Sequence, residues 1–269
     1  MSERVLFHPF PLAGIDAMTA STARSYPRHT HDQYGIGVVD AGGHASSSGR
    51  GEVEAGPGSL IFVNPGEVHD GHAIQGRPRS WRMLYVDPDL LSQALADIGG
   101  GTHAPLAFAA PVFADERLRR LFDAAFAHAL SNGPHDAMAC ETAILHLAAG
   151  MRANAAACEK TAPGPAAPIR RARERIDDDP TAPLTLTSLA GEARLSRYQL
   201  LRGFARELGL PPHAYLLQQR IALARRLIRS GHTLAETAAL AGFFDQSHLT
   251  RCFTRQFGIT PSRYAAAAG

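Results

Sequence analysis

The chain has 269 residues, of which 45% are hydrophobic, and a formal net charge of +2. This length is long for one domain, and the hydrophobic content is sufficient for two separate cores. No apolar run reaches the roughly 18 residues of a transmembrane helix, and the first residues lack the pattern of a secretory signal, so we expect a cytoplasmic protein without a membrane segment. Cys140, Cys158 and Cys252 are an odd number of cysteines without metal-like spacing, which indicates free thiols in a reducing compartment.

The N-terminal part of the chain carries short apolar runs separated by turn residues. Between residues 34 and 74 these runs are interrupted at Gly42-Gly43, at Gly56-Pro57-Gly58 and at Asn64-Pro65-Gly66. Residues 81–86 form a further apolar run of strand character. Short strands with glycine and proline turns at this density predict a small antiparallel β-barrel.

Two helices are expected after the barrel. Residues 115–130 and 136–151 place their apolar side chains at helical spacing. The pair predicts a helical hairpin whose apolar surface packs on the barrel, so residues 1–151 are assigned to one domain. Residues 152–167 are rich in proline and small side chains without apolar periodicity, which predicts an exposed linker.

The C-terminal segment, residues 168–269, is basic. It holds fifteen arginines and no lysine against eight acidic residues, a net charge of +7, whereas residues 1–167 carry −5. A basic module joined to an acidic one indicates a polyanionic partner for the basic half.

This basic segment contains a duplicated unit. Residues 196–215 and 245–264 resemble each other at a constant offset of 49. Two copies are too few for a solenoid, so a repeated helical unit is the better interpretation. The matched pairs are Leu200 with Leu249, Arg202 with Arg251, Phe204 with Phe253, Arg206 with Arg255, Gly209 with Gly258, Pro212 with Pro261, and Tyr215 with Tyr264.

Each copy has the local signals of two helices joined by a tight turn. In the second copy, a Thr233–Glu236 capping box begins one helix, Gly242 allows the turn, and Asp245 caps the next helix. In the first copy, Ser196 and Gln199 form another capping-box pair. Both second helices therefore bury an apolar stripe and turn a polar face outward.

The outward faces are candidate DNA-reading surfaces. Arginine binds guanine bidentately, glutamine pairs with adenine, and small hydroxyls or apolar groups meet a thymine methyl. An ordinary solvated helix face is the alternative, but two equivalent faces on a segment of charge +7 favour base readout. The candidates are Arg197, Tyr198, Leu201 and Arg202 on the first helix and Gln246, Ser247, His248, Thr250, Arg251 and Arg255 on the second.

The segments Gly242–Phe253 and Gly258–Tyr264 closely resemble the signature of the AraC/XylS family of transcription regulators. The resemblance covers about a hundred residues, from Ile169 to the end. It implies an all-α domain in which a long helix, here residues 215–229, joins two helix-turn-helix units that enter successive major grooves about 34 Å apart. It also implies phosphate contacts for Arg206 and Arg255. Phe244 departs from the family pattern, which has a small or polar residue there, and this puts the geometry of the following cap in doubt.

Residues 28–34 and 58–69 resemble the cupin-like sensor domain of the same family. This resemblance implies an α+β protein with a small-molecule effector inside the barrel and a homodimer formed through the helical hairpin. For Asp32, Tyr34, Arg82 and Tyr85, a surface position on the barrel rim is the alternative. The candidate effector-binding residues are His29, His31, Asp32, Tyr34, His69, Arg82 and Tyr85.

A metal in the barrel is a separate question. His29 and His31 would project from the same face of a strand, and His69 stands where a cupin places its third ligand. Three imidazoles would suit zinc, iron, nickel or manganese to differing degrees. The glutamate of the cupin pattern is missing, because Gly35 and Ile36 occupy its positions. We therefore expect no metal or other cofactor, with ligation by the three histidines as the alternative.

Three functions remain in competition. The favoured one is a regulator, not an enzyme, that binds double-stranded DNA and a small-molecule effector, with RNA polymerase as a further candidate partner. The second is a metal-dependent cupin enzyme with an accessory DNA module, but the missing glutamate and the lack of any nucleophile or phosphate motif argue against it. The third is an architectural DNA binder without sequence preference, which a specificity ratio measured at defined salt would distinguish.

Overall fold

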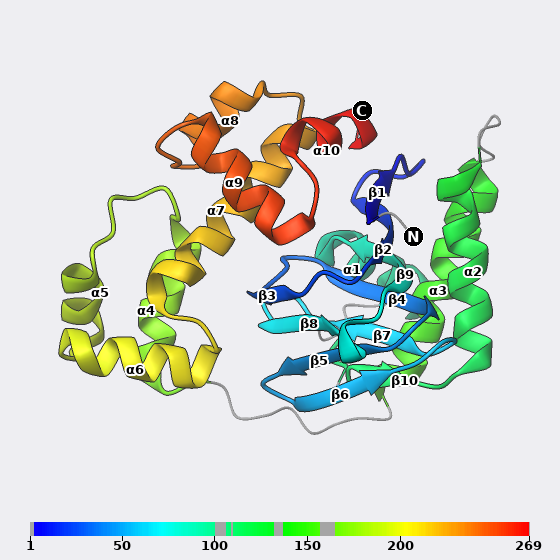
Figure 1. The fold of residues 1–269 in the computed structure, drawn as a ribbon, viewed down its shortest axis with the longest axis horizontal. Helices are drawn as coiled ribbons and strands as arrows, with labels where there is room; N and C mark the ends of the chain where they lie inside the picture. Colours follow the sequence, from blue (N-terminus) through cyan, green and yellow to red (C-terminus); the bar gives the residue numbers. More distant parts are fainter. Residues whose placement is uncertain (1–2, 100–105, 109, 132–136, 157–164, 269) are drawn as a thin grey trace.

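The computed structural model describes residues 3–99, 106–108, 110–131, 137–156 and 165–268 (Figure 1). An N-terminal domain of two antiparallel sheets flanked by helices is followed by an all-helical C-terminal domain, so the predicted α+β architecture is confirmed. None of the described helices combines the length and the apolar character that crossing a membrane would require.

The two sheets face each other in the N-terminal domain. The six-stranded sheet has the order β1 (Arg4–His8), β2 (Ile15–Thr22), β9 (Arg79–Val86), β4 (Tyr34–Ala41), β7 (Leu60–Val63) and β10 (Val112–Phe113). The four-stranded sheet has the order β3 (Tyr26–His29), β8 (His69–Ala73), β5 (His44–Ser48) and β6 (Gly51–Ala55). A short 3₁₀ turn, η1 (Ile74–Gly76), separates β8 from β9.

Alternation along the strands builds two cores from the same sheet. On β9, Trp81 and Met83 point between the sheets, whereas Leu84 and Val86 point toward the helices. The helices on that outer face are α1 (Pro88–Gly99), α2 (Glu116–Leu130) and α3 (Ala137–Ala156). The helical hairpin is present as predicted. Helix α3 ends at Ala156, five residues inside the segment predicted to be a linker, because its apolar stripe continues to Ala155.

The C-terminal domain consists of two similar helical units joined by one long helix. The first unit contains α4 (Ala167–Asp178), α5 (Leu186–Ala193) and α6 (Arg197–Leu208). The second contains α8 (Leu234–Leu240), α9 (Gln246–Phe257) and α10 (Pro261–Ala268), and α7 (Pro212–Arg229) runs between the two units (Figure 1). Each unit has its own buried cluster, so the duplication seen in the sequence corresponds to two separate cores.

The predicted helix signals operate as expected. Ser196 with Gln199 and Thr233 with Glu236 form reciprocal capping boxes. Gly242 adopts a left-handed φ of 74° in the turn before α9. Asp245 Oδ1 accepts a hydrogen bond of 2.6 Å from the backbone N–H of His248, so the unusual Phe244 does not disturb the cap.

Gly37 on β4 tests the close packing of the barrel. A Cβ at this position would collide with the Met83 sulfur and with the carbonyl oxygen of Arg82 in the neighbouring strand. We expect Gly37→Ala to lower the free energy of unfolding by about 1–3 kcal/mol, because the extra methyl must displace backbone. Gly49→Ala is the matched control, since nothing lies within 4 Å of its added Cβ. Equal unfolding midpoints for the two variants in a urea titration would contradict this packing.

Candidate nucleic-acid interface and effector cavity

Helices α6 and α9 each bury one side and expose the other. Leu200 and Phe204 of α6, and Leu249 and Phe253 of α9, have no exposed surface. The predicted DNA-reading residues lie on the opposite sides, and all of them are exposed except His248 and Thr250, which are half-buried. Apolar candidates are among the exposed ones, since 65% of Tyr198 is accessible.

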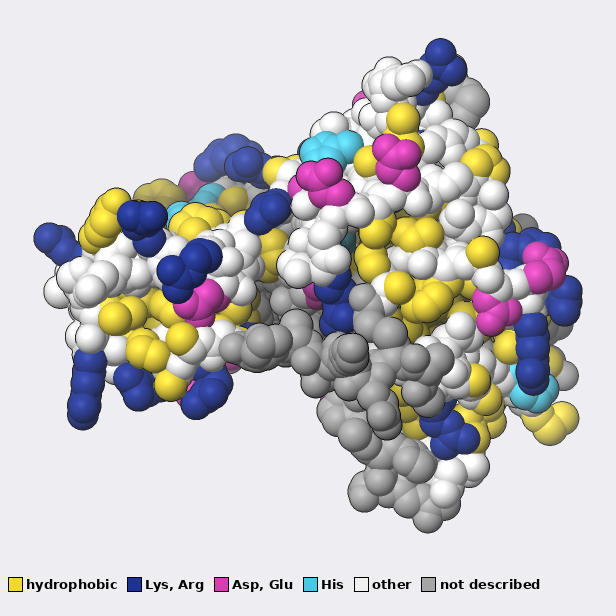
Figure 2. Space-filling view, turned by 90° about the horizontal axis from the view of Figure 1, so that it is seen from below, with side chains coloured by type: hydrophobic (Ala, Val, Ile, Leu, Met, Phe, Trp, Pro, Cys, Tyr) yellow, Lys and Arg dark blue, Asp and Glu magenta, His cyan; other side chains and the backbone are white. Residues whose placement is uncertain are grey.

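The arginines on these faces differ in how firmly they are held. The Arg202 guanidinium lies 5.6 Å from the centre of the Tyr198 ring and donates a hydrogen bond of 3.4 Å to its hydroxyl. Arg206 forms an exposed ion pair of 2.7 Å with Glu207. Within the described part of the chain, neither Arg251 nor Arg255 has an ion-pair partner. Figure 2 shows Lys and Arg side chains spread around the unit of α4, α5 and α6, at the left of the view.

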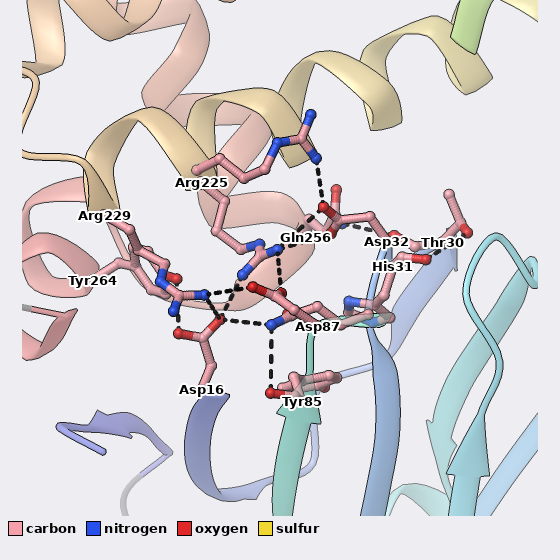
Figure 3. A network of polar contacts seen from close by, with 12 residues as sticks. Asp16, Thr30, His31, Asp32, Tyr85, Asp87, Arg225, Arg229, Gln256 and Tyr264 are labelled. Atoms are coloured by element: carbon pink, nitrogen blue, oxygen red, sulfur yellow. Dashed lines mark hydrogen bonds and ion pairs between the residues drawn. The ribbon is translucent and has the colours of Figure 1, made fainter. Parts of the chain in front are cut away.

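A buried arginine of α7 joins the two domains (Figure 3). Arg225 is 2% exposed, and its guanidinium lies 2.7 Å from Asp16, 3.1 Å from Asp32 and 3.5 Å from Asp87. Burial alone would lower the pKa of Arg225, but the three carboxylates outweigh burial and raise it. Asp32 shows the reciprocal effect: burial opposes its ionisation, yet Arg225 and Arg226 hold its pKa below the usual value. The Tyr264 hydroxyl donates a hydrogen bond of 3.0 Å to Asp16.

Further contacts fix the C-terminal ends of both candidate DNA-reading helices on the barrel. At the end of α9, Gln256 donates a hydrogen bond of 3.0 Å to the carbonyl oxygen of Thr30. The Arg24 guanidinium donates to the carbonyl oxygens of Thr254 and Arg255, each at 3.4 Å. At the end of α6, Arg28 donates to the carbonyl oxygen of Gly209 at 3.5 Å.

A cavity lies between the two sheets and reaches the domain interface. Its walls are mainly aromatic and aliphatic, and the C-terminal end of α9 forms part of them. Lining residues include Met18, Tyr26, His29, His31, His44, Ile61, Phe62, His69, Trp81, Met83, Tyr85, Gln256 and Phe257.

Three of the cavity histidines form a tight cluster. The ring centres of His29 and His69 are 4.4 Å apart, and that of His31 lies 5.0 Å and 5.3 Å from them. Burial lowers the pKa of His29 to about 3 and that of His69 to about 4, and it places the pKa of His31 well below its ordinary value. All three imidazoles are therefore neutral at physiological pH.

Four of the seven predicted effector residues line this cavity: His29, His31, His69 and Tyr85. The other three do not, so their expected placement is corrected. Asp32 binds Arg225 and Arg226 at the domain interface. The Tyr34 hydroxyl donates a hydrogen bond to the Leu106 carbonyl oxygen on the helix side of the sheet.

Arg82 is the third misplaced residue, and strand geometry explains why. It lies three positions from Tyr85 on β9, so the two side chains project to opposite faces. Arg82 instead forms ion pairs of 2.8 Å with Asp40 and 2.9 Å with Asp123 of α2. The same alternation would have pointed to Trp81 and Met83 as lining residues. Gln256 and Phe257 were missed because they belong to the other domain and carry no local signal.

Comparisons with known proteins bear on both domains. Residues 12–148 match the family model of the AraC-like ligand binding domain, and residues 189–267 match a helix-turn-helix domain. The regulator YbfI of Bacillus subtilis (strain 168) is 30% identical over 228 residues, which cover 84% of this chain and 82% of YbfI. The transcriptional activator RhaS of Klebsiella pneumoniae (strain 342) is 24% identical over 246 residues, which cover 88% and 86%.

Solved structures agree on the fold. The crystal structure of ToxT from Vibrio cholerae O395 aligns with a TM-score of 0.59 at 12% identity, over 95% of this chain and 98% of ToxT. A ToxT structure described as bound to an unsaturated fatty acid gives 0.57 at 13% identity, over 98% and 96%. The ligand-binding model alone spans just over half of the chain, and YbfI is similar along most of its length. The chain therefore belongs to the AraC family, whose members are DNA-binding transcription regulators with a ligand-binding N-terminal domain and not enzymes.

Proposed function

We propose that this regulator reads two successive major grooves with α6 and α9, and that a small molecule in the barrel cavity controls how the DNA-binding domain is held. The observation that carries this proposal is that α9 contributes both to the exposed surface of the DNA-binding domain and to the wall of the cavity. Its exposed face holds Gln246 and Arg251, whereas its last residues, Gln256 and Phe257, line the cavity. A molecule in the cavity would therefore touch a DNA-reading helix directly.

In this proposal the two helices share the work of recognition. Arginine and glutamine side chains read bases, the exposed Tyr198 and Leu201 contact thymine methyl groups, and Arg206 and Arg255 bind phosphates. The residues assigned to DNA are Arg197, Tyr198, Leu201, Arg202, Arg206, Gln246, Ser247, His248, Thr250, Arg251 and Arg255.

The walls of the cavity favour an effector with an apolar body and few polar groups, since binding sites of this kind place a few polar atoms on a mainly apolar surface. Control also requires the effector to bind the DNA-competent and DNA-incompetent arrangements with different affinity. The likeness to a ToxT structure described as bound to an unsaturated fatty acid supports a small molecule in this fold.

The same proposal includes domain roles and partners. Residues 1–151 form the sensor and dimerisation domain, residues 152–167 connect it, and residues 168–269 bind DNA. Exposed Leu130 at the end of α2 (52%) and Met138 at the start of α3 (73%) support a homodimer through the helical hairpin. We place the protein in the cytoplasm, where it binds DNA. Besides a second copy of the chain, RNA polymerase is its proposed protein partner.

Arg251 tests base readout. We expect Arg251→Ala to weaken binding to an operator selected from random DNA by about 1–3 kcal/mol, and to relax the preference at one position, because a bidentate base contact is lost. The measurement is competition binding at fixed salt. Arg120→Ala, an exposed arginine on α2, is the control and should bind as wild type. Equal losses for Arg251→Ala on operator and on random DNA would reduce Arg251 to a phosphate contact.

Trp81 allows a test of whether a small molecule binds in the cavity. It is the single tryptophan of the chain, is 6% exposed and lines the cavity, so its fluorescence reports binding there. A metabolite at one hundred times its Kd should stabilise the native state by about 2.7 kcal/mol and shift the Trp81 emission. In Trp81→Phe the emission change should disappear while thermal stabilisation is retained. Metabolites that stabilise the protein without moving the emission would locate the effector elsewhere.

Arg225 tests the docking of the domains. In Arg225→Met, Asp16 loses its ion pair of 2.7 Å and keeps only the longer one of 3.8 Å to Arg229, and we expect the domains to separate because breaking a buried ion pair costs up to about 3–5 kcal/mol. Small-angle X-ray scattering of the full chain should show a larger radius of gyration. The neighbouring Arg226→Met removes an exposed ion pair with Asp32, worth about 0–1 kcal/mol, and should leave the scattering profile unchanged. Identical profiles for the two variants would exclude Arg225 as the docking contact.

A further inference from the structure

His29, His31 and His69 converge on one point in the cavity. One ring nitrogen from each residue lies within 4.8 Å of the corresponding nitrogens of the other two. His29 at the end of β3 and His69 at the start of β8 are register partners, and His31 follows two residues after β3. Two sheet positions and the adjoining loop therefore fix the cluster.

The backbone determines which nitrogen is protonated in two of these histidines. Nδ1 of His29 lies 2.7 Å from the carbonyl oxygen of Pro27, and Nδ1 of His69 lies 3.1 Å from that of Glu67. A carbonyl oxygen only accepts, so each Nδ1 carries the proton and each Nε2 keeps its lone pair. Metal-ligating histidines are typically oriented by such a bond from the other ring nitrogen.

No described group satisfies these lone pairs. Among the described side chains, none donates a hydrogen bond to Nε2 of His29, to Nε2 of His69 or to the His31 ring. All three residues line the cavity, so an ion or a hydrogen-bond donor within the cavity can reach their free nitrogens.

A fourth acceptor faces the same cavity from the DNA-binding domain. Gln256 is 7% exposed and lines the cavity, and its Nε2 donates to the Thr30 carbonyl oxygen between His29 and His31. Its Oε1 is buried and has no hydrogen-bond partner (Figure 3). The cavity is thus lined by an unpaired amide oxygen from the DNA-binding domain as well as by the three imidazoles, which are groups that suit a cation or a hydrogen-bond donor.

We propose that His29, His31 and His69 bind one divalent transition-metal ion, with coordination positions left open toward the cavity and Gln256. Three protein ligands and an open position are a common arrangement for such ions, and imidazole is a ligand that zinc, iron, nickel and copper share. This replaces the expectation of no metal, which rested on the glutamate missing at residues 35 and 36 and not on the histidines themselves.

The test uses full-length protein without an affinity tag, stripped with a chelator and titrated with Zn²⁺ and Co²⁺. We expect one ion per chain and visible absorption bands for Co²⁺. His31→Gln and His69→Gln should each weaken Zn²⁺ binding by about 100-fold or more, because a direct ligand matters at least as much as the residues that orient it. His72→Gln, an exposed histidine on the same strand as His69, is the control and should bind as wild type.

Substoichiometric binding, or equal affinity in His31→Gln and His72→Gln, would overturn the proposal. If the ligand variants fail to fold, X-ray absorption of the Zn²⁺-loaded wild type decides. Three imidazole nitrogens at about 2.0–2.1 Å would support the site, and fewer imidazoles or a sulfur ligand would refute it. None of these measurements uses DNA or an effector, so their outcome is independent of the proposed function.

Discussion

The arrangement of this protein depends on one buried cation. Arg225 takes a full positive charge to 2% exposure, which is tolerable only because three carboxylates of the other domain surround it. Those carboxylates come from β2, from the turn before β4 and from the end of β9, which meet at one end of the barrel. Because α7 carries Arg225 and connects both helix-turn-helix units, this contact anchors the DNA-binding domain on the sensor domain, and Arg229 reinforces it at Asp16 and Asp87.

Further interdomain contacts lie at the C-terminal ends of α6 and α9. Helices α6 and α9 both end at left-handed glycines, Gly209 and Gly258, and both ends face the barrel near β3. Arg24 and Arg28 donate to carbonyl oxygens there, where the partial negative charge of a helix dipole favours a cation. The N-terminal ends, which would approach DNA, are left exposed. The barrel therefore holds both helices by their C-terminal ends and leaves exposed the ends that we propose read bases.

Local signals explain what the sequence revealed about the C-terminal domain. Caps such as Asp245 and glycine turns such as Gly242 act within a few residues, so both units could be predicted closely from a repeat of 49. Barrel residues were harder to place, because the face of a strand depends on register. Arg82 and Tyr34 were assigned to the cavity although they project toward the helices. Asp32 was assigned there because its partner, Arg225, lies almost two hundred residues away and no sequence pattern connects them.

The contacts between the two domains differ in strength, and this difference determines which of them an effector could change. Breaking the buried Arg225 network costs several kcal/mol, whereas the Gln256–Thr30 hydrogen bond contributes only about 1 kcal/mol. Allosteric couplings are typically about 1–3 kcal/mol, which is enough to replace the weak contact but not the strong one. An occupant of the cavity would therefore reposition the end of α9 about a pivot at Arg225, with both domains still joined. The unpaired Oε1 of Gln256 lies at this weak contact, so the atom best placed to sense an occupant belongs to a helix that we propose reads DNA.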